Sequence, residues 1–124
     1  MPDTAVNPTS EVELKLPDDP RVTPLVRRLA IENWEIYRDG ALRSGMPIVA
    51  AWMDIYVDRE DRTLFFVAIH CDATRQETRD FRDSLSHLTQ AWFDGLPEDE
   101  YEVASLIPFT FAGVKRNEQA VNSA

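Results

Sequence analysis

The chain has 124 residues, the size of one domain, and it is large enough to bury a core without disulfide bonds or a structural metal. With 44% hydrophobic and 28% charged residues, its composition is that of a globular protein rather than a disordered one. A formal net charge of −9 argues against binding to nucleic acid or to an anionic membrane surface, because both need clustered basic residues, but it permits a basic protein partner.

The first expected element is a short strand at residues 11–16, "EVELKL". Its three apolar residues alternate with charged ones, which is the two-residue period of a half-buried strand. Before it, residues 1–10 are polar and contain two prolines, so this segment is expected to be flexible. The "PDDP" at 17–20 ends the strand.

A helix is expected over residues 24–37. Thr23 is a good N-cap and Pro24 suits the first helical position. Apolar residues then recur at helical spacing, and Gly40 can end the helix. An alternative interpretation makes residues 34–43 a hairpin instead, with the turn at the Asp-Gly pair.

Two apolar runs at residues 48–57 and 63–71 are expected to form a hairpin, joined by the polar loop 58–62. A long helix follows. Thr74 and Glu77 have the spacing of a capping box at its start.

The end of this long helix is marked by Gly95, expected to close it in a left-handed conformation, and by Pro97. After an acidic loop, residues 101–113 are expected to form the last strand. The remaining residues, 115–124, are expected to be a flexible tail.

The predicted order β-α-β-β-α-β is that of a ferredoxin-like α+β fold, as a single domain over residues 11–114. Two right-handed crossovers would place both helices on one face of a four-stranded antiparallel sheet. Because this fold hosts many unrelated functions, it predicts none of them.

Both strands of the predicted hairpin are apolar on both faces, although a sheet with helices on one face is expected to be polar on the other. The second face keeps Trp52, Tyr56 and a complete apolar row of the second strand. Such a surface needs a cover, and pairing of two copies through the sheet face, giving a homodimer, is the leading hypothesis. The alternatives are another partner, a ligand, the tail, or the chain's own loop 39–47.

The second hairpin strand ends in His70-Cys71-Asp72, three side chains that can hold protons or metals. Adjacent strand residues point to opposite faces, so His70 and Cys71 cannot readily bind one ion together, nor act as a nucleophilic pair. His87, the other histidine, is expected to point to solvent. We therefore expect a buried Cys71, a turn or cap role for Asp72, and neither metal nor cofactor.

An enzymatic alternative rests on Asp54, an acid in the middle of an apolar strand, and on His70. If the second sheet face were a ligand cavity, as in dimeric α/β-barrel proteins, these two residues would be the candidate acid and base. The chain has no GxGxxG, GxxxxGK[ST], HExxH or GxSxG motif.

Five acids and no base occur between Asp94 and Glu102. Such a run is usually a solvated loop, but it can also dock a basic partner. The leading hypothesis is therefore a non-catalytic protein that binds another protein, such as an immunity or inhibitor protein or an accessory or regulatory subunit. The expected binding residues are Trp52, Tyr56, Asp99 and Glu100.

The predicted compartment is the cytoplasm. The chain has one cysteine, no long apolar run, and an N-terminus without the basic and apolar parts of a leader peptide. Its basic residues are mostly arginine, which suggests a bacterial source.

Overall fold

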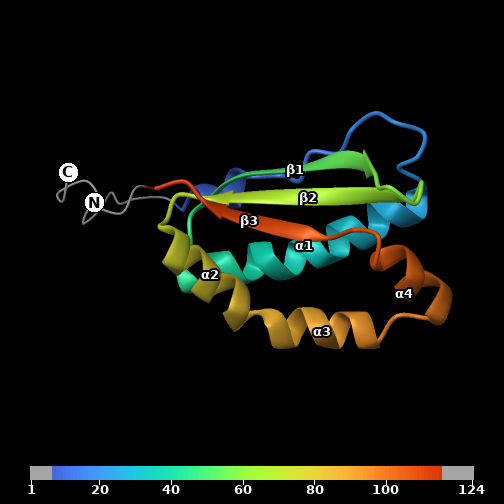
Figure 1. Cartoon of the computed structure of the whole chain (residues 1–124). Helices are drawn as coiled ribbons and strands as arrows, with labels where there is room; N and C mark the ends of the chain where they lie inside the picture. The colour runs from blue at the N-terminus through green and yellow to red at the C-terminus, as the bar shows by residue number, and fades with distance from the viewer. Residues whose placement is uncertain (1–6, 116–124) are drawn as a thin grey trace, which may run out of the picture.

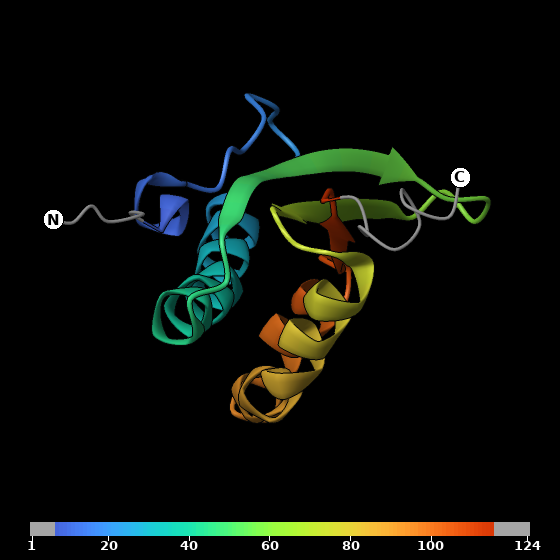
Figure 2. The ribbon, with the colours of Figure 1, turned by 90° about the vertical axis from the view of Figure 1, so that its left-hand side faces the viewer.

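The computed structural model describes residues 7–115, which form two layers, a sheet and a set of helices on one of its faces (Figures 1 and 2). The sheet has three strands in the order β1-β2-β3. In chain order the elements are the 3-10 helix η1 (Pro8–Glu11), α1 (Pro24–Ser44), β1 (Ile48–Val57), β2 (Thr63–Cys71), α2 (Arg75–Ser84), α3 (Ser86–Asp94), α4 (Glu98–Ala104) and β3 (Phe109–Gly113).

The predicted hairpin is confirmed, with β1 and β2 antiparallel and Asp54 opposite Phe66. In its turn Asp61 adopts a positive φ of 61°. A register shift between Ile48 and Ala50 marks a bulge, and Ile48 is fully buried. The bulge therefore turns the first residue of β1 to the helix side of the sheet.

The ferredoxin-like prediction is wrong, because residues 7–115 form a three-stranded mixed sheet with four α-helices. In the predicted fold the first strand would lie between the third and the last. Instead β3 pairs directly with β2, in parallel, with Val67 beside Phe109. Thus α2, α3 and α4 together form the crossover connection between two neighbouring parallel strands.

Residues 11–16, the predicted first strand, lie outside β1 and make one isolated parallel bridge, between Lys15 and Trp52. The Lys15 N–H donates to the Ala51 carbonyl over 3.0 Å, and the Met53 N–H donates to the Lys15 carbonyl over 2.9 Å. A segment with a charge at every second position, followed by proline, suits an edge better than the centre of a sheet. The central position belongs to β2, whose residues are apolar on both faces.

Helix α1 continues to Ser44, seven residues beyond the predicted end, so neither the stop at Gly40 nor the alternative hairpin at 34–43 is correct. Gly40 is buried, and a Cβ atom there would lie 2.5 Å from Leu85 Cδ1. This glycine therefore permits the close approach of another helix pair and does not end α1. The helix ends instead at Gly45, with φ of 81°.

The predicted capping box is confirmed. The Glu77 N–H donates to Thr74 Oγ1 over 3.1 Å, and the Thr74 N–H donates to Glu77 Oε1 over 2.9 Å. The prediction of a single long helix is wrong, because the helix breaks at Leu85 into α2 and α3. Leu85 is the residue that packs against Gly40, so a tertiary contact coincides with the break.

The end of the long helix also differs from the prediction. Gly95 has φ of −85° and is not left-handed. Residues 98–104, expected as an acidic loop and the start of a strand, form α4, and β3 is limited to 109–113. Three acids in the first turn of α4 interact favourably with the helix dipole, which explains how an acidic run becomes a helix start.

The core lies between the sheet and α1, where Leu29, Ile48, Val67 and Ile69 are fully buried. Tyr37 of α1 contacts two rings of β3, with centroids 5.6 Å from Phe109 and 4.8 Å from Phe111. Helices α1, α2, α3 and α4 all lie on this side of the sheet (Figure 1). The opposite face of the sheet carries no helix of the described chain.

Part of the segment expected to be flexible, residues 7–10, is packed against the domain. Thr9 is fully buried. Its hydroxyl donates to the Met46 carbonyl over 2.9 Å and accepts from the Ile48 N–H over 2.8 Å. The rest of that segment, 1–6, and the predicted tail from 116 onward lie outside the described residues.

The junction of β3 with the start of α2 gives a test of the observed topology. A Cβ atom on Gly113 would lie 2.5 Å from the Thr74 carbonyl oxygen, a backbone atom that has little room to move. We expect Gly113→Ala to lower the free energy of unfolding by about 2 kcal/mol in urea denaturation. Gly95→Ala is the matched control, since its nearest contact would be 3.5 Å. Equal effects of the two substitutions would contradict the close approach.

Candidate functional site

The candidate site is the face of the sheet that points away from the helices, called here the open face. Alternation along the strands separates it from the core, since Ala51, Met53, Val67 and Ile69 are buried on the helix side. The open face consists of Ala50, Trp52, Asp54 and Tyr56 of β1, Leu64, Phe66, Ala68 and His70 of β2, and Thr110 and Ala112 of β3.

Four ring side chains form a band across the open face. Trp52 and His70 pack edge to face, with ring centroids 4.6 Å apart at 66°. Tyr56 and Phe66 pack in the same way, at 5.8 Å and 90°. Tyr56 is 61% exposed although it is held against a neighbour. Paired rings of this kind are rigid and offer contact area at low cost in side-chain entropy.

The polar groups of the open face are few. Trp52 donates its indole N–H to Asp54 Oδ2 over 3.1 Å. His70 is half-buried beside the indole ring, and no hydrogen bond in the described part of the chain links it to Asp54. Asp54 itself is exposed, so the burial on which the enzymatic alternative depends is not present.

A groove borders the open face between β1 and the segment that carries Lys15. It has a volume of about 440 Å³. Its walls include Trp52 but neither Asp54 nor His70. Asp54 is exposed and His70 is half-buried, and neither residue lines this groove.

Cys71 lies on the other side of the sheet from His70 and is fully buried, as predicted. Burial raises the pKa of its thiol to about 11, despite a contact with the Thr78 hydroxyl that acts in the opposite direction. His87 is exposed, also as predicted. Within residues 7–115, no three His, Cys, Asp or Glu side chains are grouped so that they could hold a metal ion.

The two predicted acidic binding residues lie on the helix side, in the first turn of α4, away from the open face (Figure 1). Asp99 is exposed. Glu100 forms an ion pair with Arg28 of α1, with 2.8 Å between the carboxylate oxygen and the guanidinium nitrogen. Arg28 also pairs with the carboxylate of Glu32 at 3.1 Å. Glu32 in turn accepts from the Trp92 indole over 3.0 Å. Glu100 thus belongs to a network that joins three helices, while Trp52 and Tyr56 share the open face.

One charged feature was missed from the sequence. Arg75, Arg79 and Arg82 line a cavity between α2 and β3. Their spacing of four and three residues places them on one side of a helix, and this signal was available in the sequence. The net charge of −9 directed the prediction to acidic surfaces, so this basic cluster was not predicted.

Comparisons with models of protein families, with curated proteins and with solved structures give no match for this chain. Among the described residues, none of the helices combines the length and the apolar character that crossing a membrane requires.

The buried thiol gives a prediction on reactivity. With a pKa of about 11 rather than 9.0, native Cys71 should hold roughly a hundredfold less thiolate than the unfolded chain near pH 8. We expect iodoacetamide to label the native protein at least a hundredfold more slowly than the protein in urea. Native labelling within tenfold of the unfolded rate would show that the thiol is accessible.

The same shift makes folding stability depend on pH. Because the folded state binds the thiol proton more tightly, this contribution is complete below pH 9 and is lost as the pH rises to about 11. Cys71→Ala should lack this part of the decline. The difference in free energy of unfolding between the wild type and this variant should therefore shrink between pH 9 and pH 11.

The acidic residues of α4 provide a matched pair of substitutions. Asp99→Asn and Glu100→Gln each remove one acid from the same helical turn, so both lose the same interaction with the helix dipole. We expect Glu100→Gln to lower the melting temperature more, because Glu100, unlike Asp99, forms an ion pair with Arg28 within residues 7–115. The difference should shrink in 1 M salt, and equal melting temperatures would remove Glu100 from the network.

Proposed function

We propose that this protein is non-catalytic and acts by binding a protein partner, either a second copy of the chain or a different protein, and that the open face is the contact surface. Accessory or regulatory subunits and inhibitors of the immunity type act in this way. The observation that supports the proposal is the aromatic band, which crosses a sheet face that no described helix covers.

The composition of the open face matches the centre of a protein interface. Interface centres are rich in aromatic residues and poor in charge. The open face has Asp54 as its one carboxylate, in a chain with 22 acidic residues. Trp52 and Tyr56 are residue types that often dominate binding energy when a partner excludes water from them.

The partner with the strongest support is a second copy of the chain. A net charge of −9 opposes self-association in general, but the acids lie mostly outside the open face. Two open faces can therefore meet about a two-fold axis with little charge brought together. Packing of sheet on sheet is also a common way to bury such a surface.

The enzymatic alternative, with Asp54 and His70 as acid and base, has less support. A general base needs its substrate in a site that holds it and limits the access of water. Asp54 is exposed and accepts from Trp52, which ties its carboxylate to a role in orienting the indole ring.

Two exposed tyrosines provide the test. Tyr56 is on the open face and Tyr101 is on α4, with exposed fractions of 61% and 45%, and each has one aromatic neighbour at 5.8 Å. We expect Tyr56→Arg to weaken self-association at least tenfold in sedimentation equilibrium, which corresponds to about 1.4 kcal/mol. Tyr101→Arg carries the same charge change and should leave the association constant unchanged.

A monomeric wild-type protein at 100 μM would contradict the second-copy assignment. Photo-crosslinking in the cell from position 56, with position 101 as the control, then examines the broader proposal. Specific crosslinks from 56 alone would support a different protein partner, and none from either position would oppose the proposal.

A further inference from the structure

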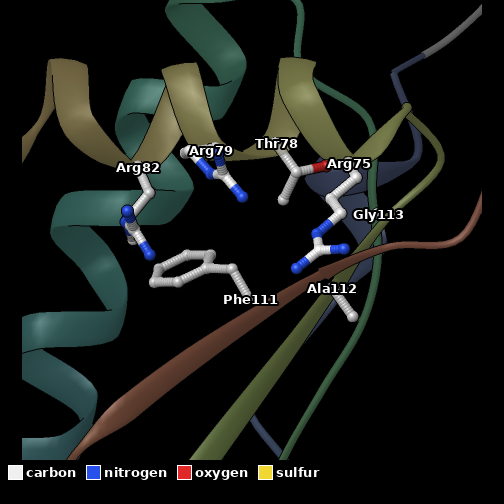
Figure 3. Close-up of a pocket in the computed structure, with 7 residues that line it drawn as sticks. All are labelled: Arg75, Thr78, Arg79, Arg82, Phe111, Ala112 and Gly113. Atoms are coloured by element: carbon white, nitrogen blue, oxygen red, sulfur yellow. The ribbon is translucent and has the colours of Figure 1, made fainter.

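A cavity of about 340 Å³ lies between α2 and β3, and α2 contributes three arginines to its lining (Figure 3). Arg75, Arg79 and Arg82 extend from α2 toward the strand, where Phe111 forms the apolar wall. A second hollow of about 420 Å³ adjoins it, shares Arg75 and Arg79, and adds Lys115.

These arginines are largely without acidic partners. Arg82 pairs with Asp83 at 2.9 Å. Arg75 and Arg79 take part in no ion pair within residues 7–115. In a chain of 22 acids and 13 bases, guanidinium groups gathered without carboxylates leave a local site for anions.

The cavity follows the backbone of β3. Its walls include the consecutive residues Phe111, Ala112 and Gly113. Successive positions along a strand face opposite sides of the sheet, so this lining follows the strand itself rather than one of its faces. The strand is at the edge, with β2 on one side and no strand of the described chain on the other.

The hydrogen bonds show which backbone groups of β3 are free. Val67 donates to the Pro108 carbonyl over 2.9 Å, and the Val114 N–H donates to Cys71 over 3.0 Å. Even-numbered positions of this strand therefore face β2. By the alternation of a parallel ladder, the N–H and C=O groups of Phe109 and Phe111 point away from β2.

We infer that the edge of β3 binds an extended acidic peptide of a partner protein, with carboxylates at alternate positions meeting the α2 arginines. The spacing agrees. Arg75 and Arg79 are four helical residues apart, about 6 Å along the axis, and alternate residues of a strand are separated by about 6.6 Å. The free backbone groups bind the peptide main chain, and the guanidinium groups select its acidic side chains.

This site is distinct from the open face and does not depend on the proposed function. It uses the edge of the sheet and the helix layer rather than Trp52 and Tyr56. A partner recognised here is acidic, the opposite of the basic partner suggested by the net charge.

The experiment uses a fluorescein-labelled peptide in which glutamate alternates with valine over eight residues, and fluorescence anisotropy with the full chain. We expect the same peptide with glutamine for glutamate to bind at least tenfold more weakly. Arg79→Gln should weaken the glutamate peptide about tenfold. Arg27→Gln, which also removes an exposed helical arginine, is the charge-matched control and should have no effect.

Amide exchange locates the bound peptide, which should protect the Phe109 and Phe111 N–H groups. A charge swap adds specificity, because Arg79→Glu should bind a peptide with lysine at the central acidic positions better than the wild type does. The inference is overturned if the glutamate peptide does not bind, if it binds without protecting those amides, or if Arg27→Gln weakens it equally. It is also overturned if inorganic phosphate binds with Arg79 dependence and the peptide does not, which would assign the cavity to small anions.

Discussion

The direct parallel pairing of β2 with β3 determines both surfaces described above. Because β2 is apolar on both faces, it occupies the centre of the sheet, and β3 becomes an edge. The crossover through α2 to α4 then joins two neighbouring strands and keeps those helices on the side of α1. One face is left without helices, and one edge is left beside the arginines of α2.

Features that depend on a few residues close together in the sequence were predicted well. The hairpin needs only two apolar runs and the polar turn between them, and the capping box needs only Thr74 and Glu77. Two of the features that were missed depend on residues far apart in the sequence. Leu85 at the break of the long helix packs on Gly40 of α1, and no local pattern reports that contact. The position of residues 11–16 likewise depended on competition among strands for the centre of the sheet.

The same distinction applies to the candidate site. Trp52 and Tyr56 were placed on one face by the strict two-residue period of a strand, which holds without any tertiary information. Glu100 was read as a docking residue because its neighbours are acidic, yet its partner Arg28 belongs to another helix. Charge counted along a chain does not show which charges are paired, and for the same reason the arginines of α2 were hidden by a net charge of −9.

The open face and the β3 edge meet, because Thr110 and Ala112 belong to the first and lie on the strand that forms the second. A peptide added to β3 would extend the sheet by one strand, so its side chains would alternate between the arginines and the open face. Acidic residues then suit one side of that peptide and apolar residues the other. Binding at the edge would therefore extend the open face beside Thr110 and Ala112, with β2 and β3 between the peptide and Trp52 of β1.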